Sequence, residues 1–330
     1  MRNGILTEAA YQRSIYRKLK NGHPDLSRHS WKRCTKLPFG QEELVISEIL
    51  MTGKEKHLLV YAAARAVTAV AAEGGHPFGV RVSVLVPEQT EEEAVREMTA
   101  VLEETAAEQK LEILNVLVEV SPDVRVPAVS VTGLGRGSVP EDSDAASSRS
   151  YDGKELVLIN PVALEGTLRV LSEKEEEIRE RFVPVFLQKL YDSENNLFAV
   201  KAAEKAAEFR AELMKPVTDS GVFGALWELA EETGTGYEVD LKAFPVRQDI
   251  IEICELFRLN PYQMASGGCL LVVLDDGRGF VEACEKEQIP AAVIGRMKAG
   301  KDKIILNGEE KRCTDRPAED EWFRICKGGK

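Results

Sequence analysis

Hydrophobic residues recur along the chain at two spacings, which separate expected helices from expected strands. Residues 55–73 repeat apolar side chains every three or four positions and end at a Gly-Gly pair, which predicts a helix. Its inward face would carry Leu58, Leu59, Ala62, Ala66 and Val70. Residues 78–87 instead place a valine at every second position, at Val80, Val82, Val84 and Val86. This alternation predicts a strand with one buried face.

The rest of the first half continues in the same way. Residues 90–93, Thr-Glu-Glu-Glu, match a capping box, so a helix is expected to start there. Its inward face would consist of Val95, Met98, Leu102, Thr105 and Ala106. Strands are expected at 111–120 and 127–135, and the strand–helix–strand–strand order is typical of an α/β layered domain. Residues 138–153 have linker composition and mark a domain boundary.

The first residues show no clear strand pattern. A basic helix is expected from residue 7, with Ile15 and Leu19 four positions apart, and it would end at Gly22. Residues 23–40 are polar, basic and rich in turn formers, so we expect an irregular, mobile segment there. The predicted organisation is a basic N-terminal helix and irregular segment over 1–53, an N-terminal domain over 54–150 and a C-terminal domain over 151–330.

The second half alternates short strands with helices. Strands are expected at 155–160, 269–274, 291–296 and 303–306. Helices are expected at 173–190, with an interruption at Pro184, and at 195–214, 248–259 and 277–288. The whole chain is therefore expected to be an α/β protein.

The stretch Lys215–Leu241 has a chemically distinctive helix start. Its apolar residues recur at helical spacing, and Gly234 is expected to end the helix. Three residue types that cap helices are followed by glycines that leave the first turn bare: Thr218, Asp219, Ser220, Gly221 and Gly224. The N–H groups of such a start can hold an anion such as phosphate. An ordinary capped core helix is the alternative, and the local sequence favours it.

Charge is distributed unevenly along the chain. The net charge is −12, yet residues 1–36 hold nine Lys or Arg against two Asp or Glu, so this part is +7 and the remainder −19. The start could be a basic arm or a transit-like peptide, but a solvated helix is favoured because Ile15 and Leu19 lie at helical spacing before Gly22. The negative charge of the whole chain argues against general nucleic-acid binding. No run of 18 apolar residues occurs, and the six cysteines form no C-x-x-C pair. We therefore expect a cytoplasmic protein with reduced thiols and no membrane association.

A family resemblance begins in this distinctive stretch. The segment VTDSGVFGALWELAEETGTGYEVDL, continued by FPVRQDIIEICELFRLNPYQMASGGCLLVVL and AAVIGRMKAGKDKIILNG, resembles the C-terminal signature of the AIR synthase (aminoimidazole ribonucleotide synthase) superfamily. The resemblance covers nearly all of residues 155–312 and is greatest to AIR synthase-related and hydrogenase-maturation carbamoyl dehydratase-like proteins. It implies a two-domain AIR synthase-like (PurM-like) fold of α+β layers. It also implies a homodimer in which the N-terminal strands of two subunits form a β-barrel with the helices outside.

The resemblance implies ATP and Mg²⁺ as cofactors, held mainly by motifs of the N-terminal half, and those motifs are largely missing here. Residues 1–60 lack a Gly-Asp-Asp segment, Thr68-Ala69 replace an Asn-Asp pair, and residues 115–119 keep only Glu119 of G-G-x-T-E. The second half keeps a T-D-S-G segment, an S-G-G turn and Glu165-Gly166-Thr167. The resemblance carries cofactor binding over to Thr218, Asp219, Ser220, Gly221, Gly224, Ser266, Gly267, Gly268 and Glu119, with no catalytic residue and no metal ligand assigned.

Three functions follow as hypotheses. The first is a degenerate member that acts in binding or regulation, for example of a phosphate-containing small molecule, as a homodimer or in a heterodimer with an intact paralogue. The second is an active ATP-dependent enzyme that activates an amide or carboxylate. The third is nucleic-acid binding through Arg13–Lys36, which the acidic remainder disfavours. The ending Phe323–Cys326 resembles the terminus whose cysteine carries the carbamoyl group in hydrogenase maturation, but a tail follows Cys326 and an ordinary thiol is favoured.

Overall fold

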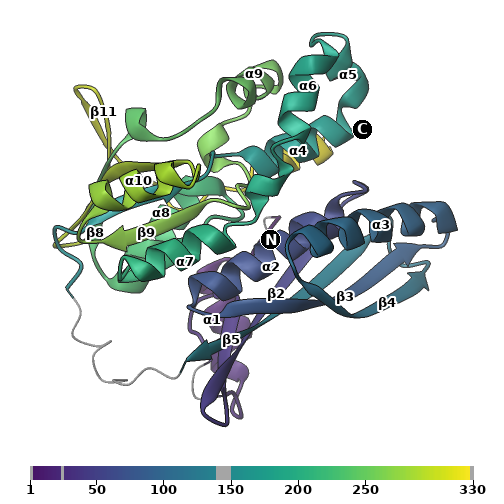
Figure 1. Ribbon diagram of the computed structural model, residues 1–330, viewed down its shortest axis with the longest axis horizontal. Coiled ribbons are helices and arrows are strands. Elements are labelled where there is room, and N and C mark those ends of the chain that lie inside the picture. The colour runs from purple at the N-terminus through teal and green to yellow at the C-terminus, as the bar shows by residue number, and fades with distance from the viewer. Residues whose placement is uncertain (1–2, 24–25, 139–149, 328–330) are drawn as a thin grey trace.

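The computed structural model describes residues 3–23, 26–138 and 150–327, and it divides into two layered units (Figure 1). The N-terminal unit is a five-stranded sheet in the order β1-β2-β5-β3-β4, and the C-terminal unit is a seven-stranded sheet in the order β12-β11-β8-β10-β6-β9-β7. Most of the predicted linker, residues 139–149, lies outside the described residues. The predicted α/β class with two sheets is confirmed.

The N-terminal sheet is antiparallel except for the parallel pair β3–β4. Its strands are β1 (Cys34–Phe39), β2 (Glu42–Thr52), β3 (His76–Pro87), β4 (Glu112–Ser121) and β5 (Ala128–Ser138), and its helices are α2 (Leu58–Ala72) and α3 (Glu92–Glu108). The four alternating valines of β3 are buried, as predicted. Helix α2 is buried along its whole length, because it packs on the sheet and also on α7 (Val200–Glu208) and β7 (Leu213–Pro216) of the other unit.

Three predictions in this unit are wrong. The segment expected to be irregular contains β1 and β2, while the first helix, α1 (Glu8–Ser14), is short and is followed by a 3-10 turn. Strand β1 was missed because it is a half-exposed edge with no clean alternation. Strand β2 was missed because the polar Ser47 stands on its buried face. The capping box at residues 90–93 does not form, since α3 begins after Glu91 with no side-chain cap.

The C-terminal sheet includes β9 (Leu270–Leu274), whose five residues are all buried. Its other strands are β6 (Glu155–Ile159), β7, β8 (Gly236–Asp240), β10 (Ala291–Lys298), β11 (Lys303–Asn307) and β12 (Glu310–Cys313). The helices, besides α7, are α4 (Leu164–Glu173), α5 (Glu175–Arg179), α6 (Pro184–Tyr191), α8 (Gly221–Thr233), α9 (Gln248–Phe257), α10 (Gly277–Lys286) and α11 (Trp322–Lys327). The expected helices 173–190 and 195–214 are wrong in extent. The first is interrupted before Pro184 as predicted, since α6 begins there, but its earlier part is only the short helix α5. The second stops in α7 before the left-handed Arg210 and is followed by strand β7.

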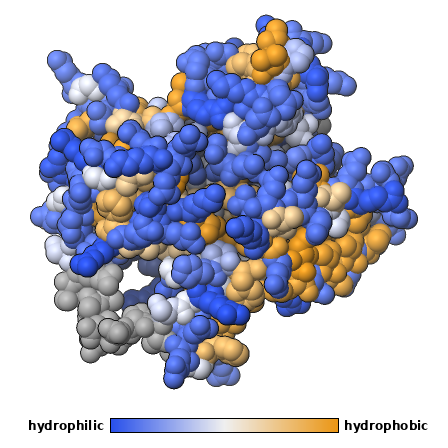
Figure 2. All heavy atoms as spheres, in the orientation of Figure 1, coloured by the Kyte–Doolittle hydropathy of each residue, from blue (hydrophilic) through white to orange (hydrophobic). Residues whose placement is uncertain are grey.

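The outer strand β4 leaves large apolar side chains uncovered on both of its faces. Their exposed fractions are 43% for Leu114, 40% for Val116, 49% for Leu117, 37% for Val118 and 65% for Val120. Figure 2 shows hydrophobic residues gathered at this edge of the N-terminal sheet. Within the part of the chain that the structure describes, no helix is long and apolar enough to cross a membrane.

Candidate functional site

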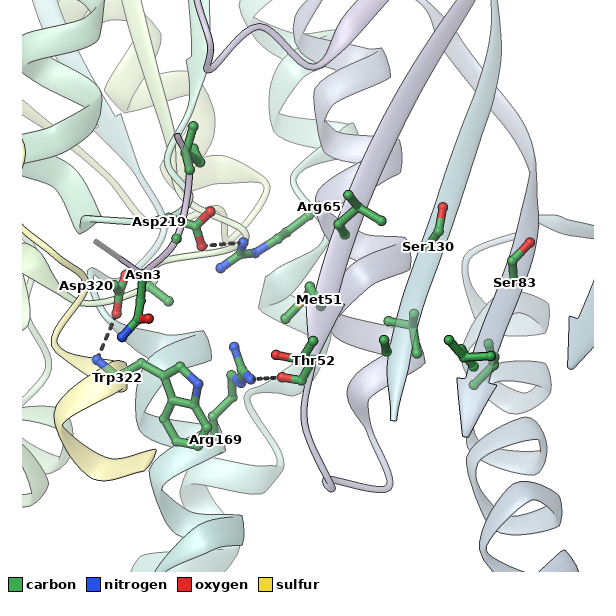
Figure 3. A pocket seen from close by; sticks show the side chains of 18 of the residues that line it. Asn3, Met51, Thr52, Arg65, Ser83, Ser130, Arg169, Asp219, Asp320 and Trp322 are labelled. Atoms are coloured by element: carbon green, nitrogen blue, oxygen red, sulfur yellow. Dashed lines mark hydrogen bonds and ion pairs between the residues drawn. The ribbon is translucent and has the colours of Figure 1, made fainter. Parts of the chain in front are cut away.

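A cleft of about 890 Å³ lies between the two units (Figure 3). One wall is formed by β2, β3, β4 and β5, and it includes the predicted residue Glu119. The other wall comes from the C-terminal unit and includes the predicted residue Asp219 together with Arg169, Asp320 and Trp322. The N-terminal segment Asn3–Leu6 completes the lining.

Arg65 of α2 joins the two units at the back of this cleft. Its side chain is 3% exposed, and its Nε and Nη2 donate to the two carboxylate oxygens of Glu165 at 2.6 and 2.8 Å. Its Nη1 donates to Oδ1 of Asp219 at 2.8 Å, and Arg33 Nη2 donates to Oδ2 of Asp219 at 3.2 Å. Burial raises the pKa of Asp219, but the charges of Arg65 and Arg33 outweigh burial and hold this pKa below its usual value. Asp219 is therefore an ionised carboxylate whose two oxygens both accept from arginine.

The start of α8 is capped from elsewhere in the chain, which corrects the predicted capping. No side chain of the three residues before Gly221 caps the helix, and Ser220 adopts a left-handed conformation with φ 62°. Instead the Ser220 N–H donates to Oδ2 of Asp320 at 2.8 Å, and the Trp322 N–H donates to Oδ1 of Asp320 at 2.8 Å. The group at this helix start is therefore a carboxyl group of the protein itself.

Asp320 is an unusual carboxyl group. It is 4% exposed, and burial raises its pKa to about 7, with a further contribution from the charge of Asp219. Its two N–H donors and Arg65 act in the opposite direction without cancelling the shift. Asp320 therefore titrates near neutral pH.

Two glycines of the predicted motif leave no room for a side chain. A Cβ on Gly221, where φ is 62°, would lie 2.5 Å from the carbonyl oxygen of Tyr262, and a Cβ on Gly224 would lie 2.8 Å from Cβ of Ser220. Close packing of the loop before Met264 therefore accounts for Gly221. The residues just before Gly221 do not share one cavity: Thr218 lines a second cavity and Ser220 lines a third.

The Ser266-Gly267-Gly268 turn supports Glu165. Ser266 is fully buried, and its Oγ donates to the Met264 carbonyl and accepts the Ala163 N–H. The Gly267 N–H donates to Oε2 of Glu165 at 3.0 Å, and a Cβ there would lie 2.2 Å from the same atom. The turn thus holds the carboxylate that pairs with Arg65.

Arg169, which the sequence reasoning missed, forms a second ion pair at the cleft. Its Nε donates to Oε1 of Glu55 at 2.7 Å, its Nη2 donates to the Thr52 carbonyl at 2.8 Å, and its guanidinium lies 4.3 Å from the centre of the Trp322 ring. Its position four residues after Glu165 on α4 is the signal that could have found it, since residues four apart share a helix face.

The described residues contain no group of three or more His, Cys, Asp or Glu side chains that could hold a metal ion. Glu119 is exposed on β4 and lines the cleft on the wall formed by the N-terminal sheet, whereas Asp219 lines the other wall. Cys326 lies on α11, and partial burial raises the pKa of its thiol to about 11. The raised pKa disfavours the thiolate form of Cys326 at neutral pH.

Comparison with known proteins agrees with this architecture. The family described as AIR synthase related protein, C-terminal domain, matches residues 152–307. A protein of Methanocaldococcus jannaschii named for hydrogenase expression and formation is 23% identical over 309 residues, which span 88% of this chain and 87% of that protein. Carbamoyl dehydratase HypE of Rhodobacter capsulatus is 22% identical over 79% of this chain and 76% of its own.

Solved structures show the same fold. E. coli HypE, a hydrogenase maturation protein, superposes with a TM-score of 0.72 at 18% identity, covering 86% of this chain and 88% of its own. A ThiL structure complexed with AMPPCP and TMP superposes with a TM-score of 0.63 at 16% identity, covering 88% and 89%. Residues 152–307 therefore match the AIR synthase related protein C-terminal domain, and the chain has the fold of the HypE and ThiL structures.

Proposed function

We propose that this chain is an AIR synthase-related protein that has lost the magnesium-dependent ATP reaction and acts in binding or regulation. The observation that carries the proposal is the pairing of Asp219, whose two oxygens accept from Arg65 and Arg33. Glu165 is likewise paired through both of its oxygens. Mg²⁺ requires oxygen ligands at close range, so binding it here would first break charge-assisted hydrogen bonds.

Two other positions support the same proposal. Thr68, which stands where the family has an Asn-Asp pair, is 1% exposed and accepts the backbone N–H of Ala199, so it serves the interface between the units. The N–H of Ser220, the residue just before α8, donates to Asp320, so the chain itself provides a carboxyl group near the place where a bound anion is expected.

The cleft keeps features suited to a phosphate-containing small molecule. Arg33 and Arg169 line it, and guanidinium groups bind phosphate without a metal ion. The exposed Leu50 and Leu117 give the sheet wall an apolar surface. A volume of about 890 Å³ is within the range of cavities that bind nucleotide-sized molecules.

The test is a sensitive assay of Mg²⁺-dependent ATP hydrolysis with the full chain and its Asp219→Ala variant. We expect no turnover above a protein-free blank for either protein. Turnover by the unaltered chain that Asp219→Ala abolishes would overturn the proposal, because it would make Asp219 part of an active phosphoryl-transfer site.

An active ATP-dependent enzyme is the second candidate, and the size of the cleft favours it. A hydrogenase maturation protein HypE crystallised in complex with ATP also shares this fold. Under this candidate millimolar ATP stabilises the chain, by about 2.7 kcal/mol when its concentration is 100 times the dissociation constant. A thermal unfolding midpoint that does not move with ATP, ADP or AMP would argue against it.

We propose further that the chain is a homodimer, joined through the exposed edge strand β4 of the N-terminal sheet. The support is the row of exposed apolar side chains on β4, an edge strand with one unpaired side. A heterodimer with an intact paralogue would use the same surface. Light scattering of the purified chain separates these, because it reports a dimer only if the chain pairs with itself.

A further inference from the structure

A second cavity, of about 490 Å³, adjoins the cleft and shares Arg33 and Arg65 with it. Its walls are the basic segment Trp31–Lys36, the end of α2, strand β7 and helix α8. We call it the Lys215 cavity. The proposed function makes no use of it, although it collects the last charges of the basic segment that the sequence singled out.

The wall formed by the basic segment carries an excess of positive charge. Lys32 and Lys36 both pair with the single carboxylate of Glu73, Lys36 at 3.8 Å and Lys32 by a direct hydrogen bond. Burial alone would lower the pKa of Lys32, but the charge of Glu73 outweighs burial and raises it. The two ammonium groups therefore share one negative partner.

The opposite wall carries an excess of negative charge. Lys215 of β7 is 10% exposed and pairs with two carboxylates of α8, Glu228 at 3.1 Å and Glu232 at 2.6 Å. The Trp31 indole N–H donates to Glu232 at 2.5 Å, which fixes the basic segment against α8. One ammonium group is thus shared between two carboxylates.

The two walls are within electrostatic reach of each other. The charge of Glu232 contributes to the raised pKa of Lys32, and the charge of Arg33 acts on Glu228. A cavity with one excess charge of each sign on facing walls is poorly matched by a simple anion or a simple cation, since each would leave one wall uncompensated.

From these contacts we propose that the Lys215 cavity binds a small zwitterionic molecule. Its acidic group would lie toward Lys32 and Lys36, and its ammonium group toward Glu228 and Glu232. The proposal goes beyond the function of the cleft, because none of these four side chains lines the cleft. It also gives the basic segment a role in a ligand site instead of nucleic-acid binding.

The experiment measures thermal stabilisation of the full chain by a panel of the proteinogenic amino acids and O-phosphoethanolamine at millimolar concentration, followed by calorimetry of any that stabilise. The N-acetyl and amide forms of the same amino acids supply single-charge probes. We expect at least one zwitterion to bind and its single-charge forms to bind about tenfold more weakly or not at all, because each loses a charge-assisted contact.

Variants on each wall locate the site. Lys36→Gln and Glu232→Gln should each weaken binding about tenfold or more, and Glu232→Gln retains an oxygen that can accept from Trp31. The exposed Lys301→Gln and Glu104→Gln are matched controls that should bind as the unaltered chain does. Circular dichroism confirms that each variant is folded. No stabilisation by any zwitterion, equal binding of single-charge forms, or unchanged binding by both wall variants would overturn the proposal.

Discussion

Replacing Arg65 with methionine would remove the guanidinium that joins the two units and would leave its partners without their charge. Glu165 is 1% exposed and would become a buried, unpaired carboxylate. Asp219 is 26% exposed and keeps its contact with Arg33, so water would screen much of its loss. Removing one member of a buried ion pair costs about 3–5 kcal/mol, and we assign most of this cost to Glu165. That is a large part of the roughly 5–15 kcal/mol that stabilises a typical domain.

Urea unfolding followed by circular dichroism would measure the change as a lower midpoint at an unchanged slope. Arg81→Met, on an exposed position of β3, is the control and should change stability by about 0.5 kcal/mol at most. The double variant Arg65→Met with Glu165→Met should be more stable than Arg65→Met alone, because it leaves no buried charge unpaired. A single variant as stable as the Arg81→Met control, or a double variant less stable than the single one, would refute the reasoning.

Three further predictions concern other parts of the molecule. The pKa of Asp320 is raised from 3.8 to about 7 in the folded chain, so this group stabilises the fold fully below pH 4, and its contribution is lost as the pH rises through about 7. Asp320→Asn should therefore reduce the fall in unfolding free energy between pH 4 and pH 8, measured by urea unfolding at each pH. An unchanged fall would contradict the assignment. Gly221→Ala should lower the free energy of urea unfolding by at least about 2 kcal/mol more than Gly300→Ala does. Both glycines have positive φ, but an added Cβ would clash with backbone only at Gly221. Equal losses of unfolding free energy would show that the loop before Met264 moves to make room. Val118→Lys on β4 should convert the proposed dimer to a monomer, measured by light scattering. The control Leu19→Lys, at an exposed site of the N-terminal segment, should leave the dimer intact. An unaltered chain that is already monomeric would contradict the proposed dimer.

The sequence predicted those elements whose burial follows a simple period. The valines of β3 face one side of the sheet without interruption, and the helix of the distinctive stretch ends at the left-handed Gly234 as expected. Strand β2 was not predicted, because Ser47 interrupts the apolar pattern of its buried face. The Ser47 hydroxyl donates to the Ala66 carbonyl at 2.8 Å. A buried polar residue satisfied by a distant carbonyl is not visible in a periodic pattern.

The site could be predicted only in part for a related reason. Glu119 and Asp219 do line one cleft, as a family-based site would require. The partner that caps α8, however, is Asp320, and it lies 100 residues beyond Ser220 in the chain. Local spacing favoured the neighbouring side chains as caps, whereas the tertiary fold brought a remote carboxylate to the helix start.

Helix α2 has no face turned to solvent, since the N-terminal sheet covers one side and α7 and β7 cover another (Figure 1). It thus belongs to the hydrophobic cores of both units at once. Separating the two units would expose one side of this helix, with its alanines and valines, to water. The two units should therefore melt together in one calorimetric transition, and any rearrangement that accompanies ligand entry is confined to side chains and surface segments.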